Sequence, residues 1–352
     1  MSSYSRPLSR KFSRDLRARL IAIYIVLLVF NAFAWLWAVA AFGFRPSLLG
    51  IALVVYGLGL RHAVDADHIA AIDNVTRKLM QEKKRPVAVG FFFALGHSTV
   101  VVIVAGVVAA AASALGRFGT FQGIGGMIST GISAIFLLTI AVMNIVIFGA
   151  IYRTYRRVRA GGAYMEEDLD VLLNSRGLLS RLFRPMFATI SKSWHMYPLG
   201  FLFALGFDTA TEVTLFGLSA TQLAQGVPFD VIMVFPVLFA AGMALVDTTD
   251  GVLMLGAYEW AFVKPMRKLY YNLTITLVSI LVAVFIGGIE VFAVIADQFG
   301  LSGGLWDVIA RLAGNFNELG FAIIGLFVAA WAISYAVYKV KKLDEIEVAG
   351  SA

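Results

Sequence analysis

Long apolar runs recur along the whole chain, and they constrain its fold more than any other feature. A run of about 20 apolar residues is the length at which an α-helix crosses the hydrocarbon core of a bilayer. Backbone N–H and C=O groups in lipid must be bonded within the protein, which favours helices. The runs predict an all-α, polytopic membrane protein with eight transmembrane helices, over residues 21–42, 48–72, 87–115, 127–151, 198–223, 230–260, 271–296 and 319–340.

Charged residues are too few to cover a surface that faces water. Of 352 residues, 60% are hydrophobic and 14% are charged, whereas soluble proteins carry about 25% charged residues. We expect a basic cytoplasmic tail at 1–20, one membrane domain at 21–340 that includes a cytoplasmic loop at 152–197, and a cytoplasmic tail at 341–352. The chain has no cysteine, which excludes disulfides and thiolate metal ligands.

The positions of Lys and Arg predict the orientation of the chain in the membrane. With eight spans both termini lie on the same side. The tails and loops of that side, together with Lys339 at the adjoining end of the last span, hold 25 of the 29 Lys and Arg residues, and the loops of the other side hold three. This asymmetry places both termini in the cytoplasm. It also explains the net charge of +7 by topology and contact with lipid headgroups, so we expect no nucleic-acid partner.

A group of side chains that commonly bind metals lies at the end of the second apolar run. It comprises His62, Asp65, Asp67 and His68. Ionisable residues inside a membrane are costly, and they commonly mark a functional site. On an ideal helix, His62, Asp65 and His68 share one face within about 120°, and Asp67 lies off it. Either Asp67 supports the site from behind, or the helix is distorted here, as in discontinuous transporter helices. A structural polar network is the alternative.

Three other apolar runs carry further candidate ligands. His97 lies in the third run, and its alternative role is a hydrogen-bonded contact between helices. Asp208 and Glu212, four residues apart, share a helical face in the fifth run. Two carboxylates on one face repel each other unless a cation or a proton lies between them. Asp247 and Asp250 share a face in the sixth run. Imidazole and carboxylate together suit a divalent first-row metal such as nickel, cobalt or zinc.

Weak internal similarity accompanies these candidates. The segment Phe92–His97 of the third run resembles Leu202–Phe207 of the fifth, and Val64-Asp65 resembles Val246-Asp247 of the sixth. Within each pair the predicted spans cross the membrane in the same direction. These similarities predict a structural repeat, with chance matching of apolar segments as the alternative.

Four motifs in order resemble the signature of the nickel/cobalt transporter family, whose members are prokaryotic and fungal secondary permeases. They are Arg61–Ile69, Leu95–Val101, Leu205–Glu212 and Gly242–Asp250, and the long basic loop after the fourth span also matches. The resemblance implies high-affinity uptake of Ni2+ and/or Co2+, with the motif of the second span central to metal capture. Efflux relatives often carry a His-rich loop, whereas the long loop here holds only His195, which favours uptake.

We therefore expect a secondary transporter that imports Ni2+ and/or Co2+ across the cytoplasmic membrane of a prokaryote. Its partners would be the metal ion and membrane lipid, with no cofactor, and its oligomeric state is left open. An efflux permease, or a transporter of another divalent metal, is the alternative. A membrane metalloenzyme is disfavoured, because the chain has four histidines and no His-Glu-x-x-His motif. A phosphate-binding Gly-x4-Gly-Lys-Ser/Thr motif is also missing from the sequence.

Overall fold

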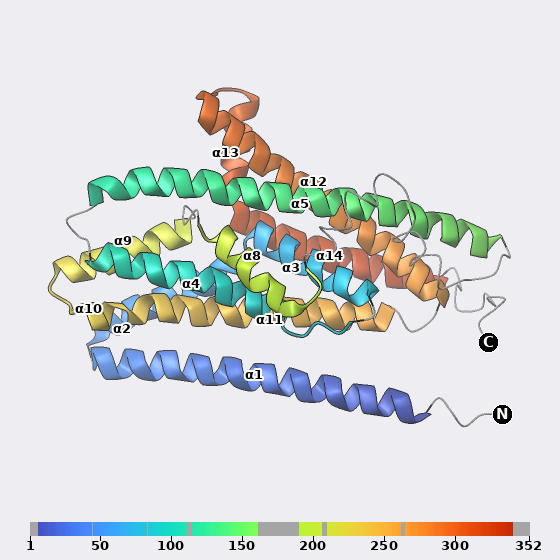
Figure 1. The fold of residues 1–352 in the computed structure, drawn as a ribbon, viewed down its shortest axis with the longest axis horizontal. Helices are drawn as coiled ribbons and strands as arrows, with labels where there is room; N and C mark the ends of the chain where they lie inside the picture. The colour runs from blue at the N-terminus through green and yellow to red at the C-terminus, as the bar shows by residue number, and fades with distance from the viewer. Residues whose placement is uncertain are drawn as a thin grey trace. The chain divides into compact units, whose positions relative to one another are not determined.

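The computed structural model describes residues 6–43, 45–82, 84–110, 115–160, 190–205, 210–261 and 265–340, and this part of the chain is helical without strands (Figure 1). The helices are α1 (Arg6–Phe42), α2 (Pro46–His62), α3 (Ala66–Gln81), α4 (Val89–Ala110), α5 (Leu115–Arg159), α8 (Met196–Phe203), α9 (Ala210–Ala224), α10 (Phe229–Ile232), α11 (Val234–Ala261), α12 (Pro265–Phe299), α13 (Leu305–Ala313) and α14 (Phe316–Val340), with a 3-10 helix at Ser193–His195.

Six of these helices are long and apolar enough to cross a membrane, namely α1, α4, α5, α11, α12 and α14, the span of α11 starting in α10. The bent pair α2 and α3, which is broken at residues 63–65, passes the same test as a pair and brings the number to seven if it is counted as one span. The predicted fifth span corresponds to α8 and α9, each too short to cross alone, with residues 206–209 outside the described part. The protein is thus a multi-pass membrane protein, while the number eight and the side of the termini stay predictions.

Large apolar side chains on the outer faces of the helices fit this conclusion. On α1, Leu28 is 64% exposed and Leu36 is 69% exposed, and Ile333 on α14 is 63% exposed. Water would be a poor solvent for so many exposed aliphatic side chains, whereas lipid tails are their natural neighbours.

Two boundaries differ from those that the sequence predicts. The segment between the predicted spans at 48–72 and 87–115 is helical as far as Gln81, because Arg77 and Lys78 of α3 are buried and bonded to protein oxygens. The predicted start of the fourth span at residue 127 is likewise too late, since α5 begins at Leu115 and includes the glycine-rich segment before that residue.

Contacts divide the chain into two compact units. The first comprises Met1–Val64, Leu79–Ser129 and Lys192–Leu255, and the second comprises Asp65–Lys78, Thr130–Ser191 and Gly256–Ala352. Each is described separately below. The prediction of one membrane domain at 21–340 remains open.

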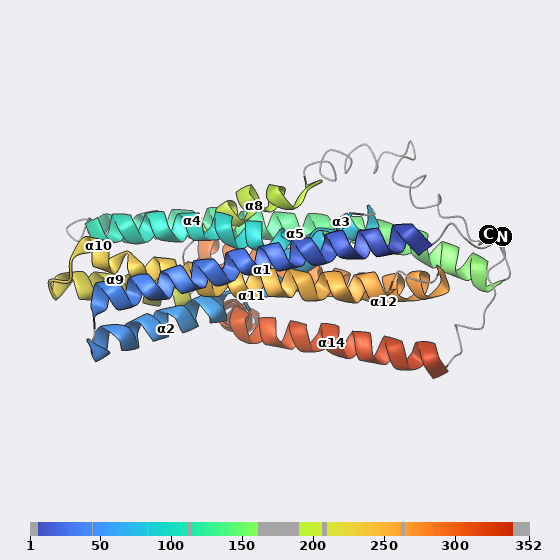
Figure 2. The ribbon, with the colours of Figure 1, turned by 90° about the horizontal axis from the view of Figure 1, so that it is seen from below.

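The first unit has an apolar core formed by α1, α2, α4, α9 and α11. Figure 2 shows α4 beside α8 and α1 beside α2, and both pairs are in contact. Asn31 of α1 also ties this core together with polar bonds. Its side-chain nitrogen donates to the carbonyl oxygen of Ala241 on α11, and its oxygen accepts from the hydroxyl of Tyr56 on α2.

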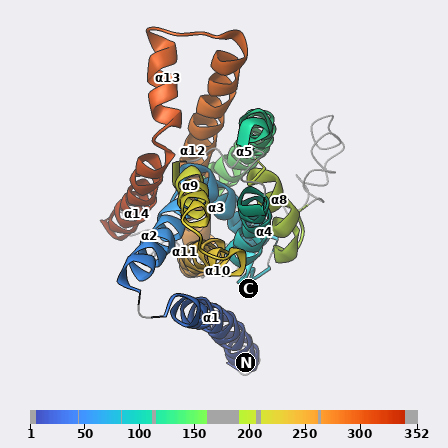
Figure 3. The same ribbon diagram turned by 90° about the vertical axis from the view of Figure 1, so that its left-hand side faces the viewer.

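The second unit combines an apolar interior with a buried polar network. The carboxylate of Asp73 on α3 accepts hydrogen bonds from Tyr258 and Ser279. One turn later, Arg77 is 1% exposed and donates to Thr276 and Asn74. A guanidinium stays charged inside a protein, so the Asp73 carboxylate is a natural source of charge balance for it. Elsewhere in this unit α13 contacts both α12 and α14 (Figure 3).

Candidate metal centre

The predicted ligand motif lies where a helix is interrupted. The last residue of α2 is His62, residues 63–65 form turns, and α3 starts at Ala66. The amide nitrogen of Ala63 still bonds to the carbonyl oxygen of Gly59, and the amide of Val64 bonds to Arg61. The angular positions that an ideal helix predicts for Asp65, Asp67 and His68 relative to His62 therefore do not apply. Of the two alternatives left by the sequence, the helix is distorted here.

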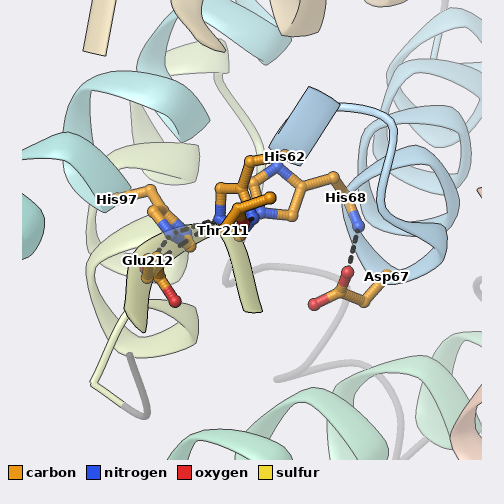
Figure 4. A network of polar contacts seen from close by, with 6 residues as sticks. All are labelled: His62, Asp67, His68, His97, Thr211 and Glu212. Carbon is orange, nitrogen blue, oxygen red and sulfur yellow. Dashed lines mark hydrogen bonds and ion pairs between the residues drawn. The ribbon is translucent and has the colours of Figure 1, made fainter. Parts of the chain in front are cut away.

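His62 meets side chains of two other helices in the first unit. Its Nε2 atom lies 3.0 Å from Nε2 of His97 on α4, and its Nδ1 atom lies 3.1 Å from the hydroxyl oxygen of Thr211 on α9. The carboxylate of Glu212, also on α9, has Oε1 3.1 Å from Nε2 of His97 and 3.9 Å from Nε2 of His62. Figure 4 shows these four side chains converging.

The three inner atoms have the spacing of ligands around a single metal ion. They are Nε2 of His62, Nε2 of His97 and Oε1 of Glu212, at separations of 3.0, 3.1 and 3.9 Å. A triangle with these sides has a circumradius of about 2.0 Å, so one point is about 2.0 Å from all three atoms, the length of a metal bond to His nitrogen or carboxylate oxygen. The spacing of the three atoms is therefore compatible with one ion bound by two nitrogens and one oxygen.

Hydrogen bonding alone satisfies this triangle poorly. A ring nitrogen of neutral imidazole presents either one hydrogen or one lone pair in the plane of the ring. Nε2 of His97 has two partners, at 3.0 and 3.1 Å, and can bond well to only one of them. A cation between the three atoms would satisfy all of them at once.

The triangle is sealed from solvent and partly lined by aromatic rings. His62 and Glu212 are each 1% exposed, and His97 is 3% exposed. The ring of Phe239 on α11 lies 5.4 Å from that of His62, and the ring of Phe93 lies 6.3 Å from that of His97. Taking a carboxylate out of water without a positive partner is costly, which again favours a cation here.

The other residues of the motif belong to the second unit. Asp65 and His68 are buried, and Asp67 is half-buried in the first turn of α3. Oδ1 of Asp67 accepts a hydrogen bond of 2.9 Å from the backbone nitrogen of His68 (Figure 4). This contact secures the start of α3 and gives Asp67 a structural role beside any role in metal binding.

No position next to the triangle is described for the remaining predicted carboxylates. Asp208 lies outside the described residues. Asp247 is fully buried on α11 and Asp250 is half-buried one turn later. Asp247 is eight residues beyond Phe239, or about 12 Å along the helix axis, so it lies about two turns from the ring that packs on His62.

Thr211 is the contact of the triangle that sequence reasoning missed. It stands beside Glu212 in the motif of the fifth run, but a hydroxyl is not a usual ligand of these metals. Its contact with Nδ1 of His62 instead helps to set which nitrogen of that ring carries the proton. The only indication of this contact in the sequence is that Thr211 directly precedes Glu212, a predicted acidic ligand.

Fold and site together define a multi-pass helical membrane protein with a buried His/carboxylate centre suited to a divalent metal ion. Comparison with known proteins gives the particular family. The family model "NicO: High-affinity nickel-transport protein" matches residues 48–337, so the chain belongs to that family.

Three named relatives align with most of the chain. The "High-affinity nickel transport protein" of Cupriavidus necator is 56% identical over 94% of this chain and 95% of its own length. "Nickel transporter NicT" of Mycobacterium tuberculosis is 43% identical over 97% and 95%. "Cobalt transport protein NhlF" of Rhodococcus rhodochrous is 40% identical over 81% of each chain. The family and these relatives are transporters rather than enzymes. No solved structure matches the chain significantly.

Proposed function

We propose that this protein is a secondary transporter that imports Ni2+ and/or Co2+ across the cytoplasmic membrane of a prokaryote. The observation that carries the proposal is the triangle of His62, His97 and Glu212, whose three atoms share a centre at the length of a metal bond. The names of the relatives, which include nickel and cobalt transporters, support the same class of substrate.

The donor set favours a metal of intermediate softness. Two imidazole nitrogens and one carboxylate oxygen suit nickel, cobalt or zinc, whereas magnesium and calcium prefer oxygen ligands alone. We assign direct ligation to His62, His97 and Glu212, and orientation of the His62 ring to Thr211.

The other predicted residues keep their proposed roles along the ion's path. Asp65 and His68 follow His62 within six residues in the sequence and remain proposed metal ligands, with Asp67 holding the start of α3. Asp208, Asp247 and Asp250 supply carboxylates from the fifth and sixth predicted spans. Such a series of acidic groups lowers the cost of moving a dication through lipid.

Membrane potential is a sufficient driving force. Moving one elementary charge through 100 mV changes the free energy by about 2.3 kcal/mol, so a dication gains about 4.6 kcal/mol on entering a negative interior. This corresponds to roughly a thousandfold accumulation. The proposal therefore requires no nucleotide, in line with the lack of a phosphate-binding motif in the sequence.

Uptake of 63Ni2+ into proteoliposomes, with an imposed inside-negative potential, tests the proposal. We expect accumulation that collapses when the potential is removed, and competition by Co2+ ranks the two metals. Inverted membrane vesicles test the alternative of efflux, because an exporter would load them with metal under the native gradients. A protein that accumulates neither metal in either preparation would disprove the proposal.

A further inference from the structure

Helices α2 and α11 touch backbone to backbone through two glycines. A Cβ atom added to Gly59 of α2 would overlap the carbonyl oxygen of Phe239 on α11. In return, a Cβ atom on Gly242 of α11 would lie 2.8 Å from the carbonyl oxygen of Tyr56 on α2. The contact is therefore reciprocal, and neither glycine can be replaced without a shift of the helices.

Helices α4 and α8 make the same contact. A Cβ atom on Gly96 of α4 would overlap the carbonyl oxygen of Tyr197 on α8, and one on Gly200 would overlap that of Phe93 on α4. Small residues let membrane helices approach this closely, and the close approach supplies packing energy where no hydrophobic effect operates between helices.

The two crossings share one pattern. Each glycine faces the carbonyl oxygen of the residue three positions before its partner glycine, and each of those residues is aromatic: Tyr56, Phe93, Tyr197 and Phe239. The helix pairs are also those that weak sequence similarity links. The register differs, however, because that similarity aligns Gly96 with Gly206, whereas the contact pairs Gly96 with Gly200.

Both crossings lie next to a histidine of the triangle. His62 follows Gly59 by three residues, and His97 follows Gly96 directly. A C–H···O contact requires about 3.3–3.6 Å, so a methyl group at either glycine would push its helix aside by on the order of 1 Å. Metal sites need ligand distances within about 0.2 Å.

We propose that Gly59 and Gly96 are positioning residues of the metal centre. The contact of Gly59 with α11 fixes how far the His62 imidazole extends toward the metal centre. The contact of Gly96 with α8 does the same for the His97 imidazole. Neither glycine touches the ion. This inference rests on the proposed function, and it adds the backbone contacts that hold the two imidazoles at their 3.0 Å separation.

The chain supplies a matched control for each glycine. A Cβ atom on Gly57, two residues before Gly59 on α2, would meet nothing within 4 Å, and one on Gly106 of α4 would meet nothing closer than the far end of Met233 at 3.7 Å, an ordinary van der Waals contact. Calorimetric titration of the purified full chain with Ni2+ compares each pair. We expect Gly59→Ala and Gly96→Ala to weaken binding roughly 10- to 100-fold. Gly57→Ala and Gly106→Ala should bind like the wild type.

A readout without metal separates positioning from overall stability. The chain has four histidines, so 15N NMR of labelled imidazoles gives few signals. We expect Gly59→Ala to alter the signals of His62 and His97, which share a hydrogen bond, while that of His195 stays unchanged. If Gly59→Ala does not fold, the milder overlap at Gly242→Ala decides, with a smaller change in the same direction.

Unchanged imidazole signals and unchanged Ni2+ affinity in Gly59→Ala or Gly242→Ala would overturn the inference. A wild-type protein that binds no Ni2+ would instead contradict the proposed function, and the NMR comparison would then decide the positioning role by itself.

Discussion

Oε1 of Glu212 lies 3.1 Å from Nε2 of His97, a contact that joins α9 to α4 inside the membrane protein. Two buried groups of this kind can share a proton, or they can share a cation. The spacing to His62 favours the cation, and the following variants distinguish the two.

Replacing Glu212 by Gln should weaken Ni2+ binding by roughly 10- to 100-fold, since the oxygen remains but its negative charge is lost. Calorimetric titration of purified protein measures the change. Glu82→Gln is the control, because the Glu82 carboxylate pairs with Lys84, at an N–O distance of 2.6 Å, and takes no part in the triangle. Equal affinity in the two variants would exclude Glu212 from the site.

Removal of either inner imidazole should abolish saturable uptake. His62→Ala and His97→Ala each delete one nitrogen of the triangle, whereas His195→Ala deletes the histidine near the end of the long loop. We expect 63Ni2+ accumulation in proteoliposomes only from the wild type and His195→Ala. Accumulation by His62→Ala at the wild-type rate would contradict the proposed centre.

The hydroxyl of Thr211 should matter through the His62 ring. Thr211→Val keeps the shape but removes the contact of 3.1 Å with Nδ1, so affinity should fall by about 10-fold or more. Thr211→Ser retains the hydroxyl and should restore most of the binding. Equal losses in the two variants would point to packing of the methyl group instead.

Acid should weaken metal binding. An imidazolium must lose a proton to bind a metal, and the histidine side chain of a model peptide titrates at about pH 6.5. Affinity for Ni2+ should therefore be full at neutral pH and fall as the pH is lowered towards 5, with protons released into the buffer on binding. Affinity that is constant from pH 5 to pH 7.5 would argue against ligation by histidine.

Asp73→Asn should destabilise the second unit. The variant removes the negative charge nearest to the buried guanidinium of Arg77 along α3, and leaving a buried charge less well compensated costs on the order of a few kcal/mol. Thermal unfolding in detergent measures the loss. Asp15→Asn is the control, because Asp15 forms an exposed pair with Arg19 that contributes about 0.5 kcal/mol. Adding Arg77→Met to Asp73→Asn should recover part of the stability.

Much of the fold can be predicted from the sequence, because a lipid environment requires long apolar helices. The apolar runs that contain α1, α4, α11 and α14 predict these helices. Arg77 shows the limit of this reasoning. A positive charge after an apolar run predicts a loop, whereas hydrogen bonds to Thr276 on α12 and to Asn74 one turn earlier on α3 stabilise the buried Arg77 side chain.

The candidate site, like the fold, could be predicted from the sequence only in part. His62, His97 and Glu212 stood out because ionisable groups are rare within apolar runs. Thr211 did not, since a hydroxyl in a membrane helix usually bonds to its own backbone. Gly57 and Gly59 are indistinguishable in the sequence, and only the packing of α11 against α2 separates them.

The break after His62 has an electrostatic consequence. The last carbonyls of a helix lack partners within it and carry about half a negative charge. The end of α2 at His62 therefore presents a partial negative charge to a cation at the triangle, which is worth about 0.3–1 kcal/mol. The start of α3 would carry the opposite charge, but Asp67 in its first turn offsets it. An unbroken helix would supply neither effect.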